Sequence, residues 1–77
     1  MTNEQMTAEI NKLNKYQRAT MREAAHRASV EYVEVNDFFK SSVTVRAKTR
    51  FTNGDAYWIC AQIGARGKLI EKRVVKA

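Results

Sequence analysis

The stretch of this chain with the clearest chemical potential is residues 43–51, where cationic side chains alternate with apolar or β-branched ones. Arg46, Lys48 and Arg50 occupy every second position. A period of two predicts a strand whose successive side chains point to opposite faces of a sheet. One face of this strand is therefore cationic, and fixed positive charge on a sheet is a candidate surface for an anionic partner.

The hairpin with the next predicted strand, residues 56–63, determines which side chains share a sheet face with these cations. A three-residue loop, Thr52-Asn53-Gly54 with Gly54 in the left-handed conformation, leaves one face of the pair almost wholly apolar. The other face then pairs Lys48 with Trp58 and Arg46 with Cys60. A two-residue turn mixes cations with apolar side chains on one face, so we favour the longer loop.

The last predicted strand, residues 69–75, follows a two-residue turn at Arg66-Gly67. That turn places Ile70 inward against Ile63 and sends Arg73 to the cationic face beside Cys60. We define the basic patch as the five residues that this arrangement brings together: Arg46, Lys48, Arg50, Trp58 and Arg73.

The basic patch has the composition that single-stranded DNA or RNA requires. Cations follow the phosphates, while an aromatic ring offers a stacking surface to any base. The alternative is a solvated strand face on which Trp58 lies against the aliphatic stems of its neighbours. We favour binding because the second half of the chain carries a large positive excess.

That excess is unevenly distributed. The 77 residues have a net charge of +6, of which residues 1–39 contribute −1 and residues 40–77 contribute +7. Partners of negative potential follow from this distribution, either nucleic acid or an acidic protein surface.

The preceding part of the chain, about residues 7–29, is rich in helix-forming residues with a stripe of apolar and small side chains. Thr7 is a candidate N-cap. Asn14 followed by Gln17 also has the form of a capping box, which would divide the segment in two. We favour one long helix.

A second set of basic side chains recurs along this helix at intervals of three and four residues. It consists of Lys15, Arg18, Arg22 and His26. The set is a candidate secondary contact with phosphates or a groove. Glu23 and Arg27, four residues apart, favour the alternative of an ordinary solvated helix face.

Catalytic and metal-binding chemistry finds little support in the sequence. Glu31, Glu34 and Asp37 lie close together, but without the spacing of a calcium loop, and we expect them to offset the basic strands. His26 has no nucleophile beside it, and we expect Cys60 to be a half-buried, inert thiol. One Cys and one His cannot form a structural zinc site. We therefore predict no enzyme activity, no metal and no cofactor.

The predicted architecture is a single α+β domain over residues 1–77, with the helix packed on one face of a three- to four-stranded antiparallel β-meander. The first strand covers residues 30–35 and ends in an Asn36-Asp37 turn, with an irregular connection over residues 38–42. Three aromatics around that connection, Tyr32, Phe38 and Phe39, either close the end of the core or form an apolar spot for self-association.

The sequence also indicates where the protein acts. A polar beginning, short apolar runs and a single cysteine predict a cytoplasmic protein without a secretory signal or membrane span. In brevity and lack of catalytic residues the chain resembles small accessory proteins of phages, although no motif supports a family assignment.

Two functions remain open. The first is a non-enzymatic nucleic-acid-binding protein that uses the basic patch. The second is a small phage-type inhibitor or adaptor that docks the same face on an acidic host protein. A homodimer is compatible with either, because a small core and an open edge strand both favour association.

Overall fold

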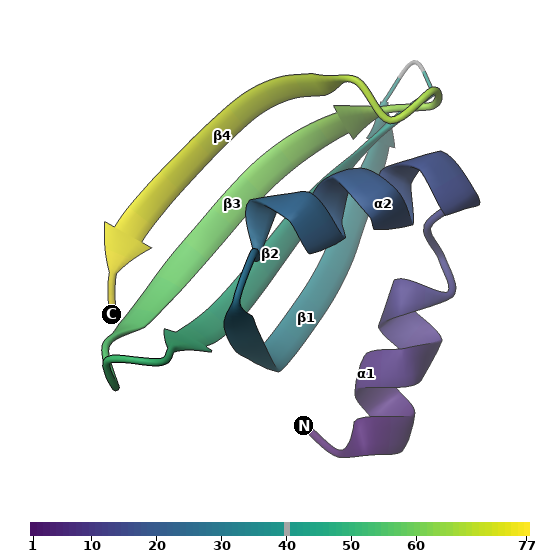
Figure 1. Ribbon diagram of the computed structural model, residues 1–77. Helices are drawn as coiled ribbons and strands as arrows, with labels where there is room; N and C mark the ends of the chain where they lie inside the picture. Colours follow the sequence, from purple (N-terminus) through teal and green to yellow (C-terminus); the bar gives the residue numbers. More distant parts are fainter. Residues whose placement is uncertain (40) are drawn as a thin grey trace.

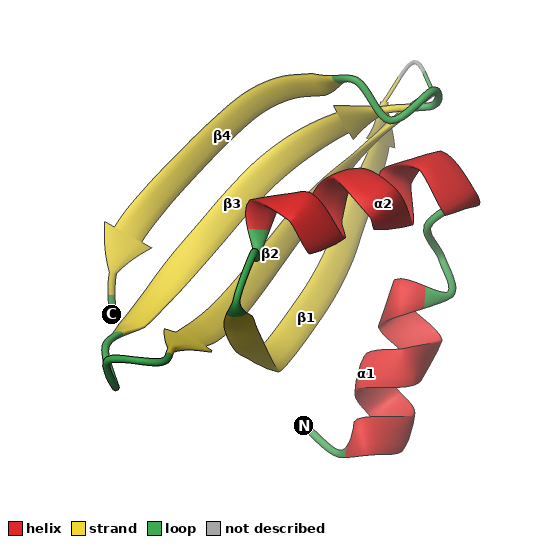
Figure 2. Cartoon of the chain, viewed as in Figure 1, coloured by secondary structure: helices red, strands yellow, loops and turns green. Residues whose placement is uncertain are grey.

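The computed structural model has two layers, with two short helices lying against one face of a four-stranded antiparallel sheet (Figures 1 and 2). It describes residues 1–39 and 41–77, with the side chains of residues 1–36 and 41–77. Strands follow one another across the sheet in chain order, which confirms the predicted α+β meander. The elements are α1 (Asn3–Ile10), α2 (Lys15–Ala24), β1 (Ala28–Phe39), β2 (Ser42–Phe51), β3 (Ala56–Gly64) and β4 (Leu69–Lys76).

The helical part of the chain is broken at Asn14, so the prediction of one helix over about residues 7–29 is wrong. The Asn14 side chain accepts a hydrogen bond from the Gln17 backbone N–H at 2.9 Å, and the Gln17 side chain accepts one from the Asn14 N–H at 3.0 Å. This capping box satisfies two amides that a helix start leaves without partners. Asn14 therefore begins a new helix, because its side chain replaces the hydrogen bonds that continuation would have provided.

The first helix begins earlier than predicted, because Thr2 rather than Thr7 is its N-cap. Thr2 and Gln5 form the same reciprocal pair of hydrogen bonds, at 3.1 and 2.8 Å. Glu4 lies in the first turn, where the positive end of the helix dipole favours a negative charge. Glu9 lies near the other end, where it pairs with Lys12 at 2.7 Å.

The first strand is longer at both ends than predicted. It begins at Ala28, directly after Arg27, whose backbone has φ +57. A bulge lies between Val30 and Tyr32, and the backbone then continues through the predicted Asn36-Asp37 turn. The turn prediction is wrong because Asn36 is paired with Thr44 of β2. Of the predicted irregular connection, Lys40 and the side chains of residues 37–39 lie outside the described residues.

The hairpin of β2 and β3 confirms the predicted register. Gly54, with φ +91, is the third residue of the loop, and the Phe51 N–H donates to the Asp55 carbonyl at 2.9 Å across its base. Lys48 lies opposite Trp58, and Arg46 opposite Cys60. The apolar pattern was thus sufficient to fix the loop length.

The hairpin of β3 and β4 repeats that loop, so the predicted two-residue turn is wrong. The Gly64 N–H donates to the Lys68 carbonyl at 2.8 Å, and Gly67, with φ +82, is the third loop residue. Leu69 therefore lies opposite Ile63, and Ile70 is the extra residue of a bulge. The bulge restores the predicted register beyond it, which places Arg73 opposite Cys60.

The core lies between the helices and the sheet face that they cover, which we call the inner face. Its buried apolar residues are Leu13, Met21, Ala25, Val33, Val35, Val43, Val45, Ala47, Ile59, Ala61 and Ile63. Gln17 is buried among them, and its amide donates to the carbonyls of Ile63 and Gly64 at 3.5 and 3.4 Å. All eight residues of β4 are exposed, and neither helix lies in front of this strand in Figure 1.

Candidate nucleic-acid interface

The sheet face opposite the helices, which we call the outer face, carries all five residues of the basic patch. They fall into cross-strand rows because paired residues of neighbouring strands point to the same side. One row, from β1 to β4, is Tyr32, Lys48, Trp58 and Val75. The next is Glu34, Arg46, Cys60 and Arg73.

Trp58 is the centre of this face. The Cζ atom of Arg46 lies 4.3 Å from the centroid of the Trp58 ring, a cation–π contact. Tyr32 meets the same ring edge-on, with centroids 5.7 Å apart and planes at 78°. Because Lys48 lies between these two aromatics in the row, the rings meet over β2. The outer face thus holds two aromatic rings beside two cations.

Tyr32 is the residue that sequence reasoning missed. The sequence places it with Phe38 and Phe39, either at the end of the core or in an apolar spot for self-association, whereas in the structure it belongs to the outer face. The signal was present: Val33 and Val35 are inward, so a period of two places Tyr32 outward. The irregular connection predicted over residues 38–42 favoured the other grouping, because it lies shortly after the predicted end of the first strand.

The patch is less cationic than the sequence predicted, because carboxylates share the outer face. Arg50 donates through Nε to Glu31 at 2.7 Å and through Nη1 to the Gly54 carbonyl at 2.8 Å. Arg73 stands 3.9 Å from Glu71, in a looser and well-exposed pair. The expectation that Glu31 offsets the basic strands is confirmed. Within the described part of the chain, Arg46 and Lys48 are the patch cations that form no ion pair.

Glu34 joins the edge of the patch through hydrogen bonds. It accepts from the Tyr32 hydroxyl and from the Asn36 side-chain amide. The Tyr32 hydrogen bond, followed by that of Asn36, lowers the pKa of Glu34. The same hydrogen bond to the carboxylate raises the pKa of the Tyr32 hydroxyl. Glu34 is therefore held as an anion that orients the Tyr32 ring against Trp58.

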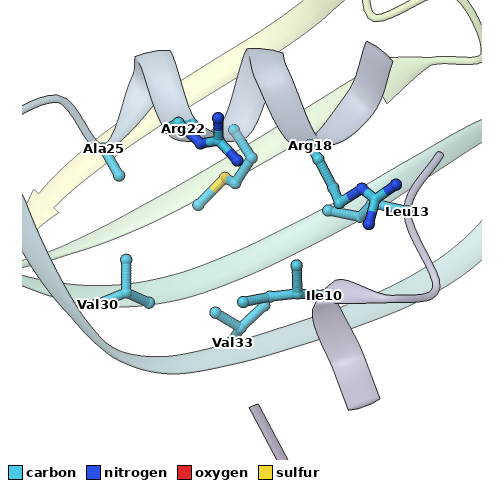
Figure 3. A pocket seen from close by; sticks show the side chains of 8 residues that line it. Ile10, Leu13, Arg18, Arg22, Ala25, Val30 and Val33 are labelled. Carbon is cyan, nitrogen blue, oxygen red and sulfur yellow. The ribbon is translucent and has the colours of Figure 1, made fainter. Parts of the chain in front are cut away.

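The secondary basic set lies in the helical layer, on the other side of the sheet from the patch. Arg18 and Arg22 stand beside a cavity of about 190 Å³ between α2, α1 and β1, whose walls are mainly apolar (Figure 3). Lys15 lies over the Tyr16 ring at 5.0 Å. His26 follows the end of α2, so it is not part of a helical stripe. The two basic surfaces do not form one continuous site.

Cys60 is half-buried between Arg46 and Arg73 in its row. Among the residues that the structure describes, no three His, Cys, Asp or Glu side chains gather closely enough to hold a metal ion. Nor does any described helix have the length and apolar character needed to cross a bilayer.

Comparisons with protein-family models, curated proteins and solved structures gave no match.

Proposed function

We propose that this protein binds single-stranded nucleic acid, without catalysis, through the outer face of its sheet. The observation that carries the proposal is the contact of Trp58 with Arg46 and Tyr32 beside Lys48 on an uncovered face. Base–aromatic stacking tolerates any sequence, and guanidinium and ammonium groups supply the phosphate contacts. A cytoplasmic location belongs to the same proposal.

The binding step follows from the present position of Arg46. Its guanidinium lies over the ring that a base would use, 4.3 Å from the centroid. A stacking base takes that position, and the displaced guanidinium, now beside the base, contacts a phosphate. Tyr32 packs against the same ring at a centroid distance of 5.7 Å and so fixes its orientation. Arg46 therefore protects the ring in the free protein and binds the backbone in the complex.

The number of phosphate contacts that we expect depends on which cations of the basic patch are already held in ion pairs. Each contact with a single strand contributes about −0.7 to the log–log slope of affinity against salt, so Arg46 and Lys48 alone give about −1.4. Release of Arg50 and Arg73 from Glu31 and Glu71 would steepen this slope. We expect a shallow slope near −1.4, because Arg50 is held by two hydrogen bonds.

The test uses Trp58 as its own reporter, since the chain contains one tryptophan. Oligothymidylate and oligouridylate are titrated into the protein at low salt while Trp58 emission is recorded. Saturable quenching supports the proposal. No quenching and no binding below about 100 µM, the affinity of weak non-specific complexes, contradicts it.

Charge variants separate the outer face from the net charge. Arg46→Glu with Lys48→Glu should abolish the quenching. The matched control is Arg66→Glu with Lys68→Glu, at exposed positions in the β3–β4 loop, which changes the net charge equally. If both double variants weaken binding to the same extent, attraction is non-specific and the outer face is not the site.

A second function has its own supporting observation. Trp, Tyr and Arg are the residue types that dominate protein–protein hot spots, and here they touch one another within a ring of mixed charge that includes Glu31, Glu34 and Glu71. Such a face fits an inhibitor or adaptor of an acidic partner protein. A pull-down from nuclease-treated lysate tests this alternative: a partner lost in the Trp58→Ala variant supports it, and the absence of any such partner contradicts it.

A further inference from the structure

The two edges of the sheet are treated differently. At the β1 edge, the Glu9 carboxylate of α1 accepts a hydrogen bond from the Val35 N–H at 3.1 Å, so a helix covers the strand and occupies an edge donor. The β4 edge has no such cover, since every residue of that strand is exposed. An open edge presents a row of backbone donors and acceptors that pair with another strand.

The side chains of β4 are unusually apolar for an unprotected edge. Exposed fractions are 40% for Leu69, 54% for Ile70, 48% for Val74 and 49% for Val75. They lie at the two ends of the strand, with Glu71, Lys72 and Arg73 between them. This order, apolar–charged–apolar, is self-complementary when the strand is paired antiparallel with itself.

We propose that β4 pairs antiparallel with β4 of a second copy, about a two-fold axis at Lys72, to form a continuous eight-stranded sheet. When this axis is perpendicular to the sheet, the inner faces of both copies lie on the same side of the joined sheet. Two residues directly opposite each other must then point to the same side. The axis therefore passes beside one residue, which faces its own equivalent, and not between two consecutive residues.

Charge selects the register from those that remain. Glu71 and Arg73 both point to the outer face, opposite Gln62 and Cys60. An axis at Lys72 places Glu71 opposite Arg73 of the second copy, and Arg73 opposite its Glu71. An axis at Glu71 opposes two carboxylates, and one at Arg73 opposes two guanidinium groups, both unfavourable. Only the Lys72 axis gives two ion pairs.

The same register places the apolar ends together. Ile70 of each copy lies opposite Val74 of the other, which removes exposed apolar surface from water. Regular pairing ends there, because beyond the Ile70 bulge Leu69 faces inward, opposite Ile63, while Val75 faces outward, opposite Trp58. Lys72 meets its own equivalent on the inner side. Like charges therefore meet at the axis, but this register sets two ion pairs against that one contact, whereas the axes at Glu71 and Arg73 give a like-charge contact and no ion pair.

The pairing does not depend on what the outer face binds. It joins the outer faces of two copies side by side, so the row that contains Arg46, Cys60 and Arg73 continues across the axis through Glu71 of the second copy.

Charge exchange tests the register. We expect the unmodified chain to sediment as a dimer in analytical ultracentrifugation. Glu71→Lys and Arg73→Glu should each weaken the dimer at least about tenfold, because each change creates two like-charge contacts. The double variant E71K/R73E exchanges the charges and should restore the dimer. A monomer at about 1 mM, or single variants that dimerise as well as the original chain, would overturn the proposal.

Cross-linking gives a second, geometric test. In a Cys60→Ser background, Lys72→Cys places two thiols opposite each other at the axis, at the separation that a disulfide requires. We expect rapid oxidation to a covalent dimer. Lys76→Cys in the same background is the matched control, since it replaces a lysine of the same strand and residue 76 faces residue 68 of the second copy. Equal cross-linking at both positions would contradict the register, and circular dichroism confirms that each variant is folded.

Discussion

Gly67 lies so close to Tyr16 that a Cβ atom on this glycine would stand 2.7 Å from the Tyr16 carbonyl oxygen. The helix α2 thus rests directly on the β3–β4 loop. The Thr20 hydroxyl donates to the Gly67 carbonyl, and the Asn14 amide donates to the Ala65 carbonyl at 2.7 Å. One loop therefore orients the helix over the sheet through backbone contact and side-chain hydrogen bonds.

Replacing Gly67 by alanine should destabilise the protein more than the same change in the other hairpin. Both Gly67 and Gly54 have positive φ, which costs an alanine about 1–2 kcal/mol. Gly54 has no atom within 4 Å of its missing Cβ, so Gly54→Ala carries only that cost. Gly67→Ala must also displace α2, an overpacking cost of about 1–3 kcal/mol. Urea unfolding of both variants measures the difference, and equal losses would contradict the close contact.

The two capping boxes should differ in their effect on stability. Asn14→Ala removes the N-cap of α2 and the hydrogen bond to Ala65, so we expect a loss of about 1–2 kcal/mol in the free energy of unfolding. Thr2→Ala removes an equivalent cap from α1, a helix without buried residues. Its effect should be confined to local fraying, seen as faster amide exchange in residues 3–6. A larger global loss for Thr2→Ala would contradict this ranking.

Acid should weaken the contact of α1 with the sheet edge. The hydrogen bond from Lys12, and then that from the Val35 N–H, lower the pKa of Glu9. A carboxyl whose folded pKa is depressed contributes stability above its unfolded pKa and loses that contribution as pH falls through the folded value. Glu9→Gln should therefore flatten the acid limb of the stability profile below about pH 4.5. Exchange of the Val35 amide, measured by NMR at neutral and acid pH, reports the same event locally.

The hydroxyl of Tyr32 should titrate at higher pH than an ordinary tyrosine. Its hydrogen bond to Glu34 raises its pKa above the ordinary value of 10.0. A group with a raised folded pKa stabilises the protein below its unfolded pKa, and that stability is lost as pH rises through the folded value. Carbon-13 NMR of the Tyr32 ring follows this titration. Glu34→Gln should bring the Tyr32 titration to lower pH, and an unchanged midpoint would contradict the hydrogen bond's role.

The cavity beside Arg18 and Arg22 should accept an added methylene group. Val30 lines it and is half-buried, so Val30→Ile should stabilise the protein by up to about 0.8 kcal/mol. Val45 is the control: it is 0% exposed within the described core, and Val45→Ile should cost about 1–3 kcal/mol by overpacking. Chemical denaturation compares the two. Destabilisation by Val30→Ile equal to that by Val45→Ile would show that the cavity is filled in solution.

The sheet was more predictable than the helical layer, for a physical reason. Apolar alternation in residues 43–51 and 56–63 admits one loop length, because a slip of one residue exposes the whole core face. The register of Lys48 with Trp58 followed from that condition. In the last hairpin the same condition was weaker, since β4 is exposed on both faces. The predicted length of its loop was therefore wrong by one residue, although the Ile70 bulge restored the alignment of Arg73 with Cys60.

The break at Asn14 and the composition of the outer face were harder to derive. Helix propensity continues across Asn14, and the capping box prevails because α2 must dock on Ala65 and Gly67, a contact between distant parts of the chain. Pairing of Arg50 with Glu31 likewise depends on the bulge in β1, which no local pattern indicates. The five residues of the basic patch were thus assigned to the correct face, while their ion pairs required the three-dimensional register.

The chain-order arrangement of the strands has a consequence for how the protein folds. Each strand pairs only with its neighbours in sequence, so the sheet can assemble by successive hairpins with short loop closures. The helix α2 precedes all four strands in the chain, yet its anchors on Ala65 and Gly67 exist only after the last hairpin has turned. During synthesis from the N-terminus, these anchors of α2 can form only once the loop of residues 65–67 has been made. A helix near one end of the chain thus depends for its place on a loop more than 40 residues further along.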